Sequence, residues 1–315
     1  MKPKEILVFG ASGQIGRHLI RKLTKNNYKV VAVTRNIHQK GYILKTQANP
    51  GYLEIVELPY FNIEKIKNLL EECSICINLI GILFEKKKNF FKNIHTDFPD
   101  LLSKLSAKKN IEKFIHLSSL GVEKSLDSNY AISKYKSELE VWRGIEEGLD
   151  AVIVNPSIIL GPGKWQKGSS IIFQQVWKGM PFYTTGTNGF VDVRDVTNVM
   201  IQLMESKVKS ERFILCAESI PFRQTFDYIA EALGKNKANI KVGPFLTTIG
   251  WRLAKIISVF TRKTPILTKE TALAGNKISI YKNDKIKKKL NFEFKSVEQS
   301  CKDFSKLFLN EYTNK

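Results

Sequence analysis

Short apolar runs alternate with amphipathic segments through the first half of the chain. Each apolar run is continuous, which is typical of a parallel strand buried on both faces, and each intervening segment repeats its apolar positions at helical spacing. The predicted strands are Glu5–Phe9, Lys29–Thr34, Leu53–Leu58, Ser74–Ile80, Lys113–Leu117 and Ala151–Asn155. Predicted helices lie at Gln14–Lys25, Ile63–Leu70 and Phe90–Ala107. Strands alternating with helices predict an α/β fold, a doubly wound parallel sheet.

After Pro156 this pattern gives way to connections rich in Gly and Pro, such as Gly161-Pro162-Gly163, and to short mixed elements. A final helix is predicted from Ser296 to Leu309, with one apolar face that should be packed, made of Val297, Cys301, Phe304, Phe308 and Leu309. We therefore expect a nucleotide-binding domain in residues 1–160, joined by residues 190–216. A smaller, mixed, mainly helical lobe should hold residues 161–189 and 217–315.

The turn after the first strand carries three glycines at three-residue spacing, Gly10, Gly13 and Gly16. Glycines there allow a tight turn and let the backbone approach a pyrophosphate at the N-terminus of the next helix. The first gap is one residue longer than in the common G-x-G-x-x-G motif. The sequence thus predicts a Rossmann-type dinucleotide site, with binding residues Gly10, Ser12, Gly13, Gln14, Ile15 and Gly16.

Composition narrows the class of protein further. The 315 residues are 43% apolar, which is enough for a proper core, and we see no signal peptide or membrane-spanning run, so a cytoplasmic protein is expected. The formal net charge is +20, but only nine of the 50 basic residues are Arg, and the lysines are dispersed. We therefore expect no nucleic-acid partner. The runs Lys86–Lys88 and Lys287–Lys289 are interpreted as solvated surface.

Cysteine and histidine positions predict no metal site. Cys73 and Cys76 have C-x-x-C spacing without a second pair, and the four cysteines are interpreted as reduced structural thiols. The four histidines, His18, His38, His95 and His116, are scattered without ligand spacing.

Tyr130 and Lys134 lie four residues apart in a helical stretch that ends near Glu147, so they share a helix face. An adjacent ammonium favours the phenolate, which makes proton exchange with a substrate oxygen easier. Lys134 is also placed to donate to a cofactor ribose. Ser119, with Ser118 as the second choice, ends a predicted strand where open α/β sheets bind ligands, and its hydroxyl can hydrogen-bond the reacting oxygen.

The glycine loop, Ser119, Tyr130 and Lys134 occur in the order typical of the short-chain dehydrogenase/reductase superfamily. The chain resembles its extended, epimerase/dehydratase-like branch over nearly the whole length. This resemblance implies cofactor contacts from Leu79, Ile80 and Gly81 and from Asn155, Pro156 and Ser157. It also implies a return into the nucleotide domain near residues 189–196.

The two halves resemble different members of the branch. Residues up to about Ser128 are similar to the nucleotide-binding accessory subunit of respiratory complex I, and the rest is similar to dihydroflavonol-reductase-like proteins. Ser119 and Tyr130 are eleven residues apart, about half the gap that extended enzymes show, in a loop that shapes their substrate pocket.

Cofactor choice depends on the end of the second strand, where a carboxylate would hold the ribose of NAD. The chain has Arg35 there and no acidic residue, which favours a 2′-phosphate and hence NADP, with NAD as the alternative.

The leading hypothesis is an NADP-dependent oxidoreductase acting on a small carbonyl or alcohol, with Ser119, Tyr130 and Lys134 as catalytic residues. The first alternative is a non-catalytic NADPH-binding structural or assembly protein of a respiratory complex. The second is a sugar-nucleotide epimerase or dehydratase. The apolar stretch from Phe245 to Phe260 is expected to be a core helix of the small lobe, with contact to a membrane or a partner as the alternative. Self-association as a homodimer is left open.

Overall fold

The computed structural model describes residues 5–58, 62–83, 85, 90–121, 128–261 and 269–313, without the side chains of residues 255–261, 269, 270 and 313. It divides into two compact units. Unit 1 holds residues up to Pro156 together with Val193–Leu215 and Asp284–Phe292. Unit 2 holds Ser157–Asp192, Cys216–Asn283 and the residues from Glu293 onward.

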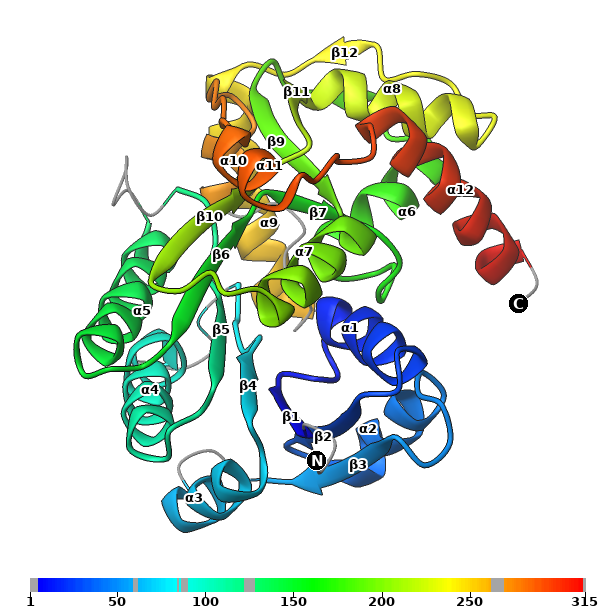
Figure 1. The fold of residues 1–315 in the computed structure, drawn as a ribbon. Helices are drawn as coiled ribbons and strands as arrows, with labels where there is room; N and C mark the ends of the chain where they lie inside the picture. The colour runs from blue at the N-terminus through cyan, green and yellow to red at the C-terminus, as the bar shows by residue number, and fades with distance from the viewer. Residues whose placement is uncertain are drawn as a thin grey trace. The chain divides into compact units, whose positions relative to one another are not determined.

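Unit 1 is built on a parallel sheet, which in the described residues has seven strands in the order β10-β6-β5-β4-β1-β2-β3 (Figure 1). The strands are β1 (Glu5–Phe9), β2 (Lys29–Thr34), β3 (Leu53–Glu57), β4 (Ile75–Asn78), β5 (Lys113–Leu117), β6 (Ala151–Pro156) and β10 (Glu211–Leu215). β1 pairs in register with both β2 and β4, so the strand order reverses between β1 and β4. At such a switch point the loops after the two strands diverge and leave a crevice for a dinucleotide.

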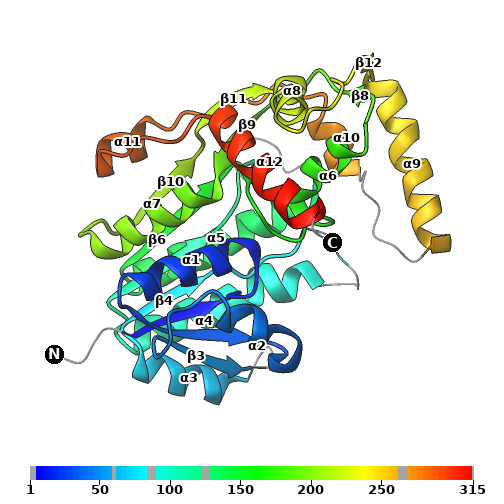
Figure 2. The same cartoon turned by 90° about the vertical axis from the view of Figure 1, so that its right-hand side faces the viewer.

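Helices cover both faces of this sheet because its strands are apolar on both sides. α3 (Ile63–Glu72), α4 (Phe98–Lys108) and α5 (Asn129–Glu146) pack in sequence on one face. α1 (Gln14–Lys25) and α7 (Val193–Glu205) lie side by side, as Figures 1 and 2 both show. α2 (Ile37–Lys45) packs beside β2 and β3, and α11 (Asp284–Leu290) lies against β10.

The expected Rossmann-type sheet is confirmed, and the predicted strands agree with the observed ones to within two residues at each end. One helix differs in kind. The segment predicted as a single helix from Phe90 to Ala107 contains a π-helical turn, η1 (Lys92–Asp97), before α4 begins at Phe98. Apolar periodicity does not reveal a π turn, because it adds only one residue to an otherwise helical pattern.

The described part of unit 2 combines two small sheets with helices. A three-stranded sheet has the order β11-β9-β7, and a two-stranded sheet joins β12 to β8. Its elements are β7 (Ile158–Leu160), η2 (Gly168–Ser170), α6 (Ile171–Trp177), β8 (Phe182–Tyr183), β9 (Thr187–Asp192), β11 (Glu218–Pro221), α8 (Phe222–Ala232), β12 (Ile240–Lys241), α9 (Pro244–Thr261), α10 (Lys269–Ala274) and α12 (Val297–Thr313).

The last helix, α12, is packed as predicted. Val297, Cys301 and Phe304 are buried, and Phe308 meets the Trp165 ring edge to face with centroids 5.1 Å apart. The Trp165 indole N–H donates to Glu311 at 2.6 Å. Aromatic packing thus joins α12 to the loop before α6.

The boundaries of the units differ from the expected ones by a few residues at 157–160, 190–192 and 216, and by a whole segment at residues 284–292. Residues 284–292 were expected in the lobe, but they belong to unit 1. Lys285 and Lys289 of α11 form ion pairs with Glu211 of β10 at 3.2 and 2.6 Å. Lys287–Lys289 is exposed, as expected for solvated surface, and Lys86–Lys88 lies outside the described residues.

The expectation of a buried core helix near Phe245–Phe260 is wrong for its described side chains. The segment is helical, as α9, but Phe245 is 76% exposed and Leu246, Ile249 and Leu253 are also exposed. These four residues lie on one stripe of the helix, so α9 presents an apolar face to solvent. No helix among the described residues is long and apolar enough to cross a membrane.

Candidate active site

The glycine loop has the close packing that its sequence predicted. Gly10 has a positive φ of 77°, and a Cβ there would lie 2.8 Å from the backbone carbon of Leu79. A Cβ on Gly16 would collide with the backbone of Ala11. Gly13 is exposed and stands at the N-cap of α1, where no side chain caps the helix. This arrangement fits a pyrophosphate, because backbone N–H groups of the first turn face outward at the positive end of a helix.

The loop after β4 lies directly beside the glycine loop. Leu79 N–H donates to the carbonyl of Phe9 at 3.0 Å, and the Asn78 side chain accepts from Ile80 N–H at 3.1 Å. The predicted contact residues Leu79, Ile80 and Gly81 are therefore placed at the switch point between β1 and β4. This is the position that the resemblance implied for them.

Tyr130 lies in the first turn of α5. Ser128 caps this helix by accepting from Ala131 N–H at 3.1 Å, a common reason for a helix to begin after serine. Burial raises the pKa of Tyr130, while an interaction with the Ser119 hydroxyl acts in the opposite direction. Ser119 Oγ is buried, and among the described residues it has no partner within hydrogen-bond geometry. The structure therefore brings the Ser119 hydroxyl near Tyr130, from the end of β5, without closing a hydrogen bond to the phenol. The loop between them lies partly outside the described residues.

Lys134 is one turn further along α5 and is only 2% exposed. Its ammonium donates to the carbonyl of Leu117, at the end of β5, at 2.8 Å. Burial lowers the pKa of Lys134 to about 8, and the carboxylate of Glu138 opposes this shift. Lys134 is therefore a buried cation one helical turn from Tyr130 on α5.

Glu138 and Asn155 form a buried polar group behind Lys134. Asn155 Nδ2 donates to Glu138 Oε1 at 2.6 Å and to the carbonyl of Ser119 at 2.7 Å. Arg212 of β10 donates to the other Glu138 oxygen at 3.1 Å. The Asn155 amide nitrogen is thus engaged within the protein, while its Oδ1 is buried and has no partner among the described residues. That oxygen is an acceptor at the carboxyl end of β6.

The other predicted residues of this segment lie at a boundary. Pro156 is the last residue of unit 1, and Ser157 is the first residue of unit 2. Ser118, the second choice for the catalytic serine, is buried and interacts with the carboxylate of Glu138. Of the two serines, Ser119 is the one whose hydroxyl acts on the pKa of Tyr130.

His95 is a member of this site that sequence reasoning missed. Its ring meets the Tyr130 ring edge to face, with centroids 5.8 Å apart and an interplanar angle of 79°. His95 is fully buried. The sequence pattern gave it no role, because the histidines lack the spacing of metal ligands. Its position just before α4 brings it near Tyr130 only through tertiary packing.

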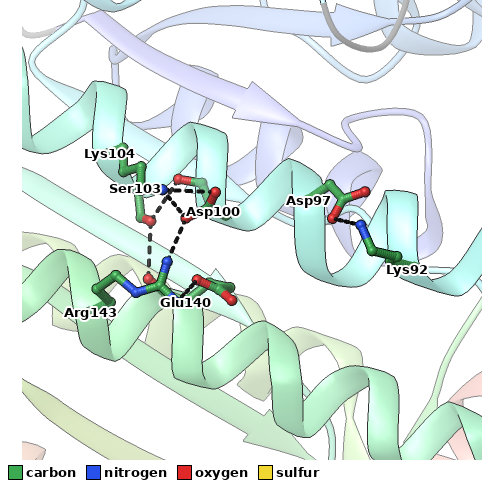
Figure 3. A network of polar contacts seen from close by, with 7 residues as sticks. All are labelled: Lys92, Asp97, Asp100, Ser103, Lys104, Glu140 and Arg143. Carbon is green, nitrogen blue, oxygen red and sulfur yellow. Dashed lines mark hydrogen bonds and ion pairs between the residues drawn. The ribbon is translucent and has the colours of Figure 1, made fainter.

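A network of polar contacts joins α4 to α5 (Figure 3). Arg143 donates to Asp100 at 3.1 Å and pairs with Glu140 at 2.8 Å. Ser103 Oγ donates to the backbone carbonyl of Glu140 at 3.1 Å, close to Gly144, where a Cβ would lie 2.9 Å from Ser103 Cβ. The close approach at Gly144 fixes α5, and with it the positions of Tyr130 and Lys134, against the neighbouring helix.

Arg35 lies immediately after β2, exposed, as expected for a phosphate ligand. The structure adds a carboxylate that the local sequence did not show. Glu57, at the end of the neighbouring strand β3, accepts from Ile37 N–H at 3.2 Å. The turn after β2 therefore holds one cationic and one anionic side chain.

The fold and site together define a protein of the nicotinamide-dinucleotide-binding class, with a tyrosine-lysine pair on the helix that follows β5. Residues 6–216 match the model of the NAD dependent epimerase/dehydratase family. The chain therefore belongs to the NAD dependent epimerase/dehydratase family. This confirms the resemblance to a family of NAD-dependent enzymes that was expected from the sequence, and the choice between NADP and NAD stays a prediction.

Comparison with individual proteins gives the same two resemblances. The 40 kDa mitochondrial subunit of NADH-ubiquinone oxidoreductase from Neurospora crassa is 27% identical over 154 residues, which cover 49% of this chain and 40% of that protein. The chain thus spans less than half the length of this relative. A putative dihydroflavonol 4-reductase from Synechocystis is 22% identical and covers 96% of this chain and 94% of its own.

Solved structures share the fold along the whole chain. UDP-glucose 4-epimerase from Thermotoga maritima, solved with UDP-glucose, superposes with a TM-score of 0.76 at 21% identity, covering 98% of this chain and 99% of that one. At this identity the likeness establishes the fold.

Proposed function

We propose that this protein is an NADP-dependent oxidoreductase that acts on a small carbonyl compound or secondary alcohol. One observation carries the proposal. Tyr130, Lys134 and Ser119 converge at the carboxyl edge of the unit 1 sheet, the edge that also bears the loop of Gly10. A protein that only bound a nucleotide would have no chemical need for this set.

Each residue has a role that its surroundings support. Tyr130 exchanges a proton with the substrate oxygen, and Ser119 hydrogen-bonds that oxygen from the end of β5. With a pKa of about 8, Lys134 is mostly protonated at neutral pH and stabilises the phenolate. The bound nicotinamide supplies or accepts the hydride, and the protein contributes orientation and proton transfer. The unpartnered Asn155 Oδ1 offers an acceptor for the cofactor or the substrate.

The preference for NADP rests on Arg35. A guanidinium at the end of β2 suits the 2′-phosphate, which a carboxylate at this position would repel. The Glu57 carboxylate is the competing group, and its hydrogen bond to Ile37 N–H holds it against the first turn of α2. NAD is the alternative cofactor. Direct titration, which compares the affinities for NADPH and NADH, distinguishes the two possibilities.

The decisive experiment combines binding with turnover. NADPH and NADH are titrated against thermal stability, and NADPH oxidation is then followed with a panel of aldehydes and ketones. UDP-glucose with NAD is included to test the epimerase or dehydratase alternative. The variant Tyr130→Phe should bind NADPH and lose turnover about a hundredfold or more. Tyr135→Phe, an exposed tyrosine of the same helix, is the matched control. Tight cofactor binding without turnover, unchanged in Tyr130→Phe, would overturn the enzymatic role.

A second candidate is a non-catalytic NADPH-binding component of a larger respiratory assembly. The exposed apolar stripe of α9 favours it, because monomeric proteins rarely leave such a stripe uncovered. The Neurospora crassa relative, a subunit of NADH-ubiquinone oxidoreductase, points to the same class of partner. Leu246→Lys together with Leu253→Lys should release the protein from such an assembly in its native host without weakening NADPH binding. Co-sedimentation with respiratory complexes measures this, with Tyr42→Lys, an exposed residue of unit 1, as control.

A further inference from the structure

His95 makes hydrogen bonds through both ring nitrogens. Nε2 accepts from the backbone N–H of Ile82 at 3.0 Å, and Nδ1 lies 2.8 Å from Ser133 Oγ. Because Nε2 is an acceptor, the proton of the neutral ring is on Nδ1, which therefore donates to Ser133. Ser133 in turn donates its hydroxyl proton to the backbone carbonyl of Tyr130 at 2.7 Å. These three hydrogen bonds form a series in which each donor has one acceptor. Each group donates toward the next, from Ile82 in the loop after β4 to the carbonyl of Tyr130.

This imidazole is neutral at physiological pH. Burial, with the nearby Lys134 ammonium as a second cause, lowers the pKa of His95 to about 3. A protonated ring would also direct an N–H at the N–H of Ile82. His95 is therefore unsuited to be a general acid or base near pH 7, and with both nitrogens engaged it acts through the groups that it holds.

The ring also encloses the phenol. Phe91 stacks on His95 with centroids 5.3 Å apart and meets the Tyr130 ring edge to face at 6.0 Å. His95 meets the same phenol ring edge to face. Tyr130 is thus held through its backbone by Ser133 and through its ring by two aromatic neighbours.

A second imidazole makes a parallel bridge one helical turn away. Asn78 Nδ2 lies 3.3 Å from His116 Nδ1, and His116 Nε2 lies 3.0 Å from Ser137 Oγ. Asn78 Oδ1 accepts from Ile80 N–H, so this bridge also begins at the loop after β4 and ends on α5. It reaches Ser137, however, and makes no aromatic contact with Tyr130 among the described residues. His116 thus provides an internal comparison for His95.

We propose that His95 is a positioning residue that, through Ser133, aligns the Tyr130 phenol with the cofactor-contact loop at Leu79–Ile82. This inference rests on the proposed function for its catalytic consequence, but the alignment itself is a property of the protein alone. The same loop packs against Gly10, so one imidazole connects the place where the cofactor lies to the residue that transfers the proton.

The test uses two serine variants on one helix. Ser133→Ala removes the group that links His95 to Tyr130, and Ser137→Ala removes the equivalent group of the His116 bridge, with similar burial. Each variant is labelled with tyrosine carrying carbon-13 at Cζ, and Tyr130 is assigned by the signal lost in Tyr130→Phe. Because burial raises the pKa of Tyr130, loosening the phenol should bring its titration down by about half a pH unit or more in Ser133→Ala. Ser137→Ala should leave it unchanged.

Two further measurements distinguish a failure of this inference from a failure of the proposed function. In wild type, nitrogen-15 shifts of His95, assigned with His95→Gln, should show the Nδ1–H tautomer without titration between about pH 5 and 8. If turnover is found, Ser133→Ala should lower kcat about tenfold or more with little change in the NADPH Kd. His95→Phe should also lose activity. His95→Gln should retain part of that activity, because its side chain keeps a donor and an acceptor. Equal Tyr130 titrations in both serine variants, or an Nε2–H tautomer, would overturn the inference even if the enzyme is active. Failure of NADPH binding or turnover in wild type would overturn the proposed function and leave the tautomer and titration results to stand by themselves.

Discussion

Lys134 and Glu138 lie one turn apart on α5, and each is only 2% exposed. The carboxylate raises the pKa of Lys134, whereas burial, the larger effect, lowers it to about 8. In the reverse direction, Lys134 lowers the pKa of Glu138 against a larger rise caused by burial. The protonation of Lys134 therefore depends on a residue that the substrate is not expected to touch.

Replacing Glu138 with Gln should lower the pKa of Lys134 further. The alkaline limit of NADPH affinity, or of turnover, is expected to move to lower pH by about half to one unit. The measurement is the pH dependence of the NADPH Kd between about pH 6 and 9.5. Glu140→Gln on the same helix is the control, since Glu140 pairs with Arg143 at the surface. Superimposable profiles for wild type and Glu138→Gln would show that Glu138 does not tune Lys134.

Replacing Lys134 with Met should stabilise the protein at neutral pH. The pKa of Lys134 is about 8 in the folded state, below its ordinary value, so the unfolded chain binds more protons between about pH 8 and 10.5. As pH rises through this range, the free energy of unfolding of wild type therefore increases relative to that of the variant, by at most about 3 kcal/mol. Urea denaturation of both proteins at pH 7 and pH 9.5 measures the difference. A stability difference that does not change with pH contradicts the prediction.

The two buried imidazoles should make the fold sensitive to acid. Burial lowers the pKa of His95 to about 3 and that of His116 well below its ordinary value. Below about pH 6.5 these two histidines are therefore protonated in the unfolded chain and remain neutral in the folded one. Stability is fully present above about pH 6.5 and falls on the order of 2 kcal/mol per histidine by about pH 5. In His95→Gln the loss between pH 7.5 and pH 5, measured with urea, should shrink by about that amount. An undiminished loss would mean that His95 is not held neutral.

The glycine loop can be tested with a pair of alanine substitutions. Gly10 and Gly51 both have φ near +80°, but a Cβ on Gly51 meets nothing within 4 Å, whereas one on Gly10 meets the backbone of Leu79. Both substitutions incur conformational strain of about 1–2 kcal/mol. Gly10→Ala should lose about 1–3 kcal/mol more, because the β4 loop must move, and its NADPH affinity should fall as well. Thermal denaturation with and without NADPH separates the two effects. Equal losses for the two variants would argue against the close approach.

Cofactor preference is tested at Arg35. Arg35→Glu should weaken NADPH about a hundredfold and change NADH much less, because the guanidinium is proposed to contact only the 2′-phosphate. Glu57→Gln, which removes the nearby carboxylate, should strengthen NADPH severalfold. Fluorescence titration of both cofactors with wild type and the two variants gives the six dissociation constants. Equal effects of Arg35→Glu on NADPH and NADH would place the phosphate elsewhere.

The sequence was sufficient for the sheet and for the residues whose partners are close in the chain. Tyr130 and Lys134 were found because their four-residue spacing is itself the geometry, and Ser119 because it ends a recognisable strand. His95 was missed because its partners, Ile82 and Ser133, are 13 and 38 residues away. One signal was available. Ser133 and Ser137 are polar residues one turn apart, next to Lys134, in a helix that must be buried on that face.

The exposed face of α9 shows a different limit. The sequence of α9 correctly indicated a helix. Its apolar content does not reveal, however, whether another element of the fold covers the apolar face. Arg212, which pairs with Glu138, was equally inaccessible to sequence reasoning, because the pair forms only when β10 joins β6 in the sheet. Such pairings depend on topology, which spacing along the chain does not encode.

The π-helical turn at Lys92–Asp97 makes this part of the protein intolerant of changes in chain length. A π turn accommodates one residue more than an α turn, so the segment stays helical on both sides while the direction of its side chains advances by about 100° at that point. Deleting Thr96, which lies between His95 and α4, should leave an ordinary helix and rotate His95 relative to α4. A chain in which this turn is one residue shorter should therefore carry a different group opposite Ser133.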